Sequence, residues 1–125
     1  MIKTLDFLAL ASYCLFIYWL SDQPHLPAPM WFSNQDKLHH FGAYFVMAVL
    51  AWRYFKHFQR QVVLLPLATL SFCSLYGLSD EWHQSFIIGR QSDAMDWLAD
   101  TIGAGLALLV LYTPKPRRLN LATGR

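Results

Sequence analysis

The sequence carries little charge for its length. Only 14% of its 125 residues are Asp, Glu, Lys or Arg, whereas 55% are hydrophobic and 16% are aromatic. In an ordinary soluble domain about a quarter of the residues are charged. This composition excludes an intrinsically disordered chain and a protein that coats nucleic acid, so no nucleic-acid partner is expected. The length allows one domain, either a membrane protein or an unusually apolar helical bundle.

Cysteine and standard catalytic motifs are also scarce. The two cysteines, Cys14 and Cys73, each lie alone within an apolar run. This arrangement excludes a disulfide framework and a cysteine-based zinc site. The sequence contains no nucleophile-elbow, HExxH or Walker motif, so no standard motif indicates a reaction class.

What the sequence does contain is a set of four apolar runs, at residues 5–20, 38–52, 62–78 and 97–112. Each run alone is shorter than the roughly 20 residues that cross a bilayer. However, a helix of a soluble bundle needs a polar stripe, and residues 41–52 include no charged or amide side chain. The runs together therefore indicate helices that are surrounded by lipid.

The sequence predicts an all-α fold, an integral membrane bundle of four transmembrane helices in a single domain over residues 1–125. Flanking polar residues are expected to lengthen the helices beyond the apolar runs. The predicted spans cover approximately residues 5–20, 38–54, 62–80 and 96–113. Within the last span, Gly103 and Gly105 are expected to let a neighbouring helix approach closely.

The distribution of basic residues predicts the orientation. Eight of the ten Lys and Arg residues lie in the N-terminal segment, the second connection and the C-terminal tail, and only Lys37 and Arg90 lie in the other two connections. By the positive-inside rule, both termini are then cytoplasmic. A cleaved signal peptide is the alternative for the first helix, but residues 19–22 (WLSD) offer no small-residue cleavage site.

Most ionisable residues gather at the predicted extracytoplasmic end, and polar groups at a membrane edge are candidates for function. Asp36, His40 and Tyr44 recur every four residues at the start of the second span. They share one helix face, with Lys37 beside them. The alternative is that His39 and His40 lie beside lipid headgroups and that Tyr44 points outward to the interface.

A second polar group follows the third apolar run. It places four polar residues within five positions: Asp80, Glu81, His83 and Gln84. The alternative is a solvated helix end with an Asp80–His83 pair. Gly89 then predicts a chain reversal that returns Arg90 toward the carboxylates, where it is either their counter-ion or an anion clamp.

Three carboxylates open the fourth span, at Asp93, Asp96 and Asp100. Asp93 is the predicted N-cap, and Asp96 three residues later is expected to complete a capping box. Asp100 lies one turn deeper among apolar residues. It is therefore expected to be protonated, paired with Arg90 or a histidine, or bound to a ligand.

These motifs together resemble the VanZ-like family of small bacterial membrane proteins, which is named for a protein associated with teicoplanin resistance. The resemblance extends over nearly the whole chain. It rests on residues 21–24 (SDQP), on the DKxxHxxxY motif of residues 36–44, and on the longer DExHQxFxxGR motif of residues 80–90 with the Asp93, Asp96, Asp100 and Gly103 that follow. It implies a four-helix protein of the bacterial cytoplasmic (inner) membrane and a link to glycopeptide resistance, but no established reaction. The family commonly has Asn where this chain has Asp100, and Pro where it has Ile88.

Three functions remain open for this polar end. The first is a site that binds or processes a lipid-linked cell-envelope precursor or a phosphate headgroup, with membrane lipids as partners. Its expected binding residues are Lys37, His40, Tyr44, Gln84 and Arg90. The second is an enzyme that uses acid–base chemistry or a divalent cation, and its candidate catalytic residues are Glu81, His83, Asp96 and Asp100. The third is a non-catalytic module whose polar network holds the helices together or contacts a partner protein.

Overall fold

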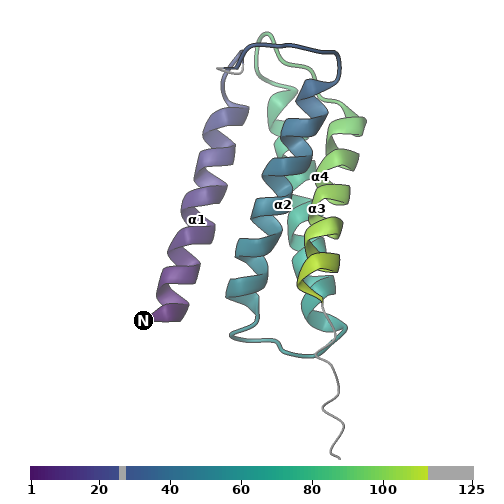
Figure 1. Cartoon of the computed structure of the whole chain (residues 1–125). Helices are drawn as coiled ribbons and strands as arrows, with labels where there is room; N and C mark the ends of the chain where they lie inside the picture. Colours follow the sequence, from purple (N-terminus) through teal and green to yellow (C-terminus); the bar gives the residue numbers. More distant parts are fainter. Residues whose placement is uncertain (26–27, 113–125) are drawn as a thin grey trace, which may run out of the picture.

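A computed structural model of the chain describes residues 1–25 and 28–112 and shows four antiparallel helices (Figure 1). The helices are α1 (Ile2–Ser21), α2 (Gln35–Phe55), α3 (Leu64–Gln84) and α4 (Ala94–Leu111). No residue within the two described ranges forms a β-strand. The predicted all-α fold with four helices is therefore confirmed. The end of the predicted fourth span at residue 113 and the basic C-terminal tail lie outside the described residues.

The helices extend past the apolar runs at their polar ends, as expected. Helix α2 begins at Gln35. Its N-cap residue, Asn34, has a left-handed backbone conformation with a φ of 63°. Helix α3 continues past Leu78 to Gln84. Both helices have 21 residues, so each is about 31 Å long at 1.5 Å per residue. By length and composition, α1 and α4 are apolar enough to cross a membrane.

The side chains are distributed in the reverse of the pattern in a soluble bundle. Each helix directs large apolar side chains outward, for example Leu15 (70% exposed), Val46 (44%), Leu75 (66%) and Leu109 (74%). The buried set includes many polar residues: Asp6, Ser21, Gln35, His40, Thr69, Asp80, Glu81, Gln84, Asp96 and Asp100. An apolar exterior, with polar residues buried beside an apolar core, is the arrangement that suits a lipid environment.

Helices α2 and α4 approach each other closely because the residues between them are small. Ala48 and Ala104 are completely buried there. A Cβ on Gly103 would overlap the backbone carbonyl of Phe41, so only glycine fits at this position. The prediction for Gly105 is wrong, since nothing lies within 4 Å of the place where its Cβ would be. That glycine faces away from the neighbouring helices.

Helix α1 packs on α2 and α3 and, within the described helices, does not contact α4. Hydrogen bonds and salt bridges hold α1 against the other helices. The Tyr13 hydroxyl donates to the Ala43 carbonyl at 2.8 Å. Near the N-terminus, the buried carboxylate of Asp6 contacts Arg53 Nη2 at 2.8 Å and His57 Nε2 at 2.8 Å. These contacts lie at the end of the bundle that holds the N-terminus and the α2–α3 connection (Figure 1).

Candidate functional site

A buried cluster of ionisable residues lies at the opposite end of the bundle, and His40 of α2 is its centre. His40 Nδ1 lies 2.9 Å from Asp100 Oδ1 on α4 and 3.9 Å from Glu81 Oε1 on α3. Its other ring nitrogen, Nε2, lies 3.8 Å from Asp96 Oδ2. The imidazole therefore connects three helices. The interfacial alternative is wrong for His40 and Tyr44, because both are buried, whereas His39 is exposed.

Asp100 is completely buried, and two neighbours make that possible. One is His40, which contacts Asp100 Oδ1. The other is Gly77 of α3, since a Cβ there would lie 2.7 Å from Asp100 Oδ2. Within the part of the chain that the structure describes, Oδ2 has no hydrogen-bond partner. Of the states expected for Asp100, pairing with a histidine is the one observed.

Glu81 joins the end of α3 to the start of α4. Its Oε2 accepts a hydrogen bond from the backbone N–H of Asp93 at 2.8 Å, while Oε1 has no partner among the described residues. Asp93 is the N-cap of α4, as predicted, and its Oδ1 accepts from the Met95 N–H at 2.8 Å. The predicted capping box is wrong in its second half, because Glu81 rather than Asp96 accepts the N–H of the N-cap residue.

Lys37 forms salt bridges with the carboxylates that lie nearest the surface. Its Nζ lies 3.3 Å from Asp36, 2.9 Å from Asp93 and 3.0 Å from Asp96. The Met95 N–H and the Lys37 ammonium favour the charged form of Asp93 and lower the pKa of its carboxyl. Lys37 contacts these three groups, and within the described ranges the deeper carboxylates of Glu81 and Asp100 have His40 as their only salt-bridge partner.

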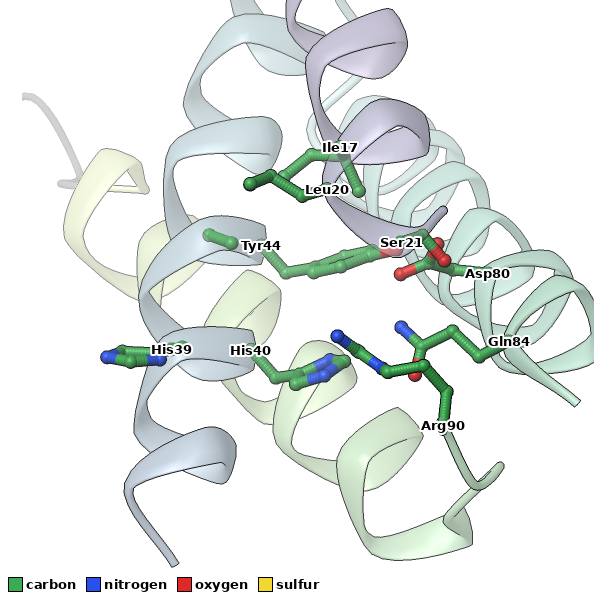
Figure 2. Close-up of a pocket in the computed structure, with 10 residues that line it drawn as sticks. Ile17, Leu20, Ser21, His39, His40, Tyr44, Asp80, Gln84 and Arg90 are labelled. Carbon is green, nitrogen blue, oxygen red and sulfur yellow. The ribbon is translucent and has the colours of Figure 1, made fainter. Parts of the chain in front are cut away.

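A cavity of about 80 Å³ adjoins the cluster between α1, α2 and α3. Its polar lining includes His40, Tyr44, Asp80, Gln84 and Arg90. Figure 2 shows the Arg90 side chain extending from the α3–α4 connection into this space. In the described ranges Arg90 makes no salt bridge with a carboxylate, although Asp80 lines the same cavity. The volume is enough for several water molecules.

A wider recess of about 610 Å³ lies at the same end of the bundle. It shares His40 and Arg90 with the cavity, and residues of both connections at this end line it, among them Pro24 and Ser92. Gly89 allows the chain to reverse here with a φ of 90°, a conformation that residues with a side chain rarely adopt. The turn directs the following residue, Arg90, back toward the helices.

Comparison with known proteins agrees with the motifs. The family described as VanZ/LLP1 matches residues 7–115. The chain belongs to the VanZ/LLP1 family. The matched range contains every residue of the cluster and the cavity.

One VanZ/LLP1-like relative is the uncharacterized protein C11E3.10 of Schizosaccharomyces pombe. It is 32% identical over 102 residues, which is 81% of this chain and 59% of the yeast protein. The chain thus spans less than two thirds of the length of this relative. No solved structure gives a significant match.

The structure divides the predicted site residues of this VanZ/LLP1 protein into three groups. Five of them form the ionisable cluster: Lys37, His40, Glu81, Asp96 and Asp100. Three line the adjoining cavity: Tyr44, Gln84 and Arg90. His83 lies apart, because its ring stacks on Tyr18 at 4.5 Å between centroids and its Nε2 is 3.3 Å from Asp22. The side chain of His83 is therefore directed toward α1 and not toward the carboxylates of the ionisable cluster.

Sequence reasoning missed Gly77. A signal was present, since Gly77 lies four residues before Glu81 and so shares with it the face of α3 that meets α4. Chemically, the assembled site offers three distinct capacities. It has a guanidinium in a cavity, without a salt bridge to any described residue, and a buried imidazole–carboxylate pair. It also has three donor groups, His40, Glu81 and Asp100, whose ligand atoms all lie within 4.8 Å of one another.

Proposed function

We propose that this VanZ/LLP1 protein crosses a membrane four times, with both termini in the cytoplasm and the polar cluster at the extracytoplasmic side. In a bacterial cell this membrane is the cytoplasmic membrane. All four helices direct large apolar side chains outward, which supports immersion in lipid. Lys3, Arg53, Lys56 and Arg60 lie at the end opposite the cluster, and this placement supports the orientation.

Within that frame we propose that the polar end binds a lipid with a phosphate headgroup. The observation that carries the proposal is Arg90, a guanidinium without an ion-pair partner in the described residues that points into a partly polar cavity (Figure 2). A guanidinium binds phosphate oxygens through two parallel hydrogen bonds, and unlike an ammonium it is weakly hydrated. Gln84 lines the same cavity and adds an amide donor.

The surroundings of Arg90 favour a lipid over a free anion. The cavity is lined on one side by the apolar residues Ile17, Leu20 and Ala43, which belong to the contact between α1 and α2. Its polar side opens toward the recess at the end of the bundle, where a headgroup would lie. The class that we propose is the lipids that carry a phosphate headgroup. In bacteria, a lipid-linked envelope precursor is the member of this class that we propose.

The proposal is tested with purified protein in detergent and native mass spectrometry. Long-chain isoprenoid phosphate is added to the parent, to Arg90→Gln and to Arg60→Gln. Arg60 is an exposed arginine at the other end of the bundle, so its substitution is a matched control. We expect a lipid adduct on the parent and on Arg60→Gln, and at least about a ten-fold loss in Arg90→Gln, because a charged hydrogen-bond pair contributes roughly 1.5–3 kcal/mol.

Two results would contradict this assignment. Equal adducts on all three proteins would place the lipid elsewhere on the apolar surface. A parent that binds a neutral isoprenoid alcohol as well as the phosphate would show that Arg90 recognises no headgroup, and would favour a non-catalytic module whose polar network holds the helices together. The proposed link to glycopeptide resistance has its own measurement, the teicoplanin susceptibility of cells that express the parent or Arg90→Gln.

A further inference from the structure

We propose that His40, Glu81 and Asp100 form a binding site for one divalent metal ion. The site lies beside the cavity that holds Arg90 and shares only His40 with the lining of that cavity. It rests on its own geometry and does not depend on lipid binding. Each residue comes from a different helix, α2, α3 or α4, and each is buried. One ion at this place would thus join three helices of the bundle.

The first argument is that two carboxylate oxygens here have no partner. Glu81 is 3% exposed and Asp100 is 0% exposed. Glu81 Oε1 and Asp100 Oδ2 form no hydrogen bond within the described ranges. A buried polar atom without a partner is destabilising, and a charged one much more so. A cation between the two carboxylates would remove that cost.

The second argument is distance. One ligand atom from each of the three residues lies within 4.8 Å of the others. A metal–ligand distance of about 2.0–2.2 Å places the ligands of a tetrahedral ion roughly 3.3–3.6 Å apart. His40 Nδ1 already lies 2.9 Å from Asp100 Oδ1 and 3.9 Å from Glu81 Oε1, so side-chain movements of about 1 Å bring the three groups into a coordination shell. Gly77 leaves the space that the Asp100 carboxylate needs for such a movement.

The third argument is the support around the ligands. A histidine that binds a metal through one nitrogen usually directs the other toward a carboxylate. Here His40 Nδ1 faces Asp100 and Glu81, while Nε2 lies 3.8 Å from Asp96 Oδ2. Asp96 is held in turn by Lys37 at 3.0 Å, and the second oxygen of Glu81 is held by the Asp93 N–H at 2.8 Å. Two of the three expected ligands, His40 and Glu81, thus face a group outside the coordination shell.

The charge and type of the donors indicate the class of metal. Two ionised carboxylates and a neutral imidazole carry a charge of −2, which a divalent cation balances. One nitrogen and two oxygens suit Zn²⁺ or Mn²⁺ better than Ca²⁺ or Mg²⁺, which prefer oxygen ligands alone. Because His40 also lines the cavity, the coordination positions left by the protein would face that space.

The experiment measures metal binding in buffer that contains neither phosphate nor added lipid, so that its failure is distinct from failure of headgroup binding. Tag-free protein in detergent is treated with a chelator, dialysed, and titrated calorimetrically with Zn²⁺ and with Mn²⁺. We expect one ion per chain. We expect His40→Gln and Asp100→Asn to bind at least about ten-fold more weakly. His39→Gln is the matched control, because Figure 2 shows the neighbouring ring directed away from His40.

A second measurement covers the case in which a variant does not fold. Mn²⁺ bound to the parent is examined by pulsed electron paramagnetic resonance, and coupling to one imidazole nitrogen is expected. The proposal is overturned if the parent binds neither metal at one ion per chain, if folded His40→Gln binds as tightly as His39→Gln, or if the bound Mn²⁺ shows no nitrogen coupling.

Discussion

At the scale of single residues, the position of Asp100 imposes the strictest requirements on its neighbours. Its carboxylate lies within the bundle without contact to solvent, and only His40 contacts one of its oxygens. The other oxygen occupies the space that a side chain at position 77 would fill. A glycine on α3 is thus as necessary for the cluster as the ionisable residues are, although it supplies no functional group.

Replacing Gly77 with Ala should therefore disturb the cluster. The added Cβ would lie 2.7 Å from Asp100 Oδ2, so the carboxylate that contacts His40 must move. Overpacking of this kind costs about 1–3 kcal/mol, which we expect as a lower free energy of unfolding in detergent. Gly42→Ala is the control, because nothing lies within 4 Å of its Cβ position and alanine favours a helix. Equal melting temperatures for the two variants would contradict the role of Gly77.

At the scale of the elements, the sequence was sufficient for the helices and for part of the site. Apolar runs identify α1 to α4, the N-cap chemistry of Asp93 identifies the start of α4, and the spacing along α2 groups Asp36, His40 and Tyr44 on one face. Spacing does not define how each helix is rotated against its neighbours. His83 and Gln84 are adjacent on α3, about 100° apart around the axis. Only the packed structure shows that Gln84 faces the cavity and that His83 faces α1.

The same limit applied to pairing between elements. The sequence offered Asp96 as the partner of the Asp93 N–H because these residues are three positions apart. In the structure Glu81, twelve positions before Asp93, accepts that hydrogen bond, and Asp96 is free to contact Lys37. The local capping box and the contact with Glu81 both require the N–H of Asp93. The contact with Glu81 forms because α3 and α4 meet at their polar ends.

The attachment of α1 makes a prediction at this scale. Asp6 is buried and contacts both Arg53 and His57 of the segment at the end of α2, so Asp6→Asn would leave a weakened contact for each. We expect the melting temperature in detergent to fall by several degrees. Asp22→Asn, at the other end of α1, removes an exposed contact with His83 and should change stability little. A larger effect of Asp22→Asn would show that α1 is held mainly at the polar end.

At the scale of the whole molecule, the two ends of the bundle differ in charge and in role. The end with the N-terminus carries most of the described basic residues and one buried acid, Asp6, which is paired. The opposite end holds the remaining acidic residues, the cavity and the recess. The outer surface between the ends is apolar. This polarity along the bundle axis is what a protein needs if it is to cross a membrane in one orientation and present one site on one side.

The proposed four-span topology is open to a direct test. Fusions that end after Arg60, in the α2–α3 connection, and after Arg90, in the α3–α4 connection, should place a reporter on opposite sides of the membrane. Alkaline phosphatase should be active only after Arg90, and a fluorescent protein that folds in the cytoplasm only after Arg60. If α2 and α3 did not cross, both fusions would report the same side. That result would exclude four spans, because these two connections lie at opposite ends of α3, and it would leave α1 and α4 as the only candidate crossings among the described helices.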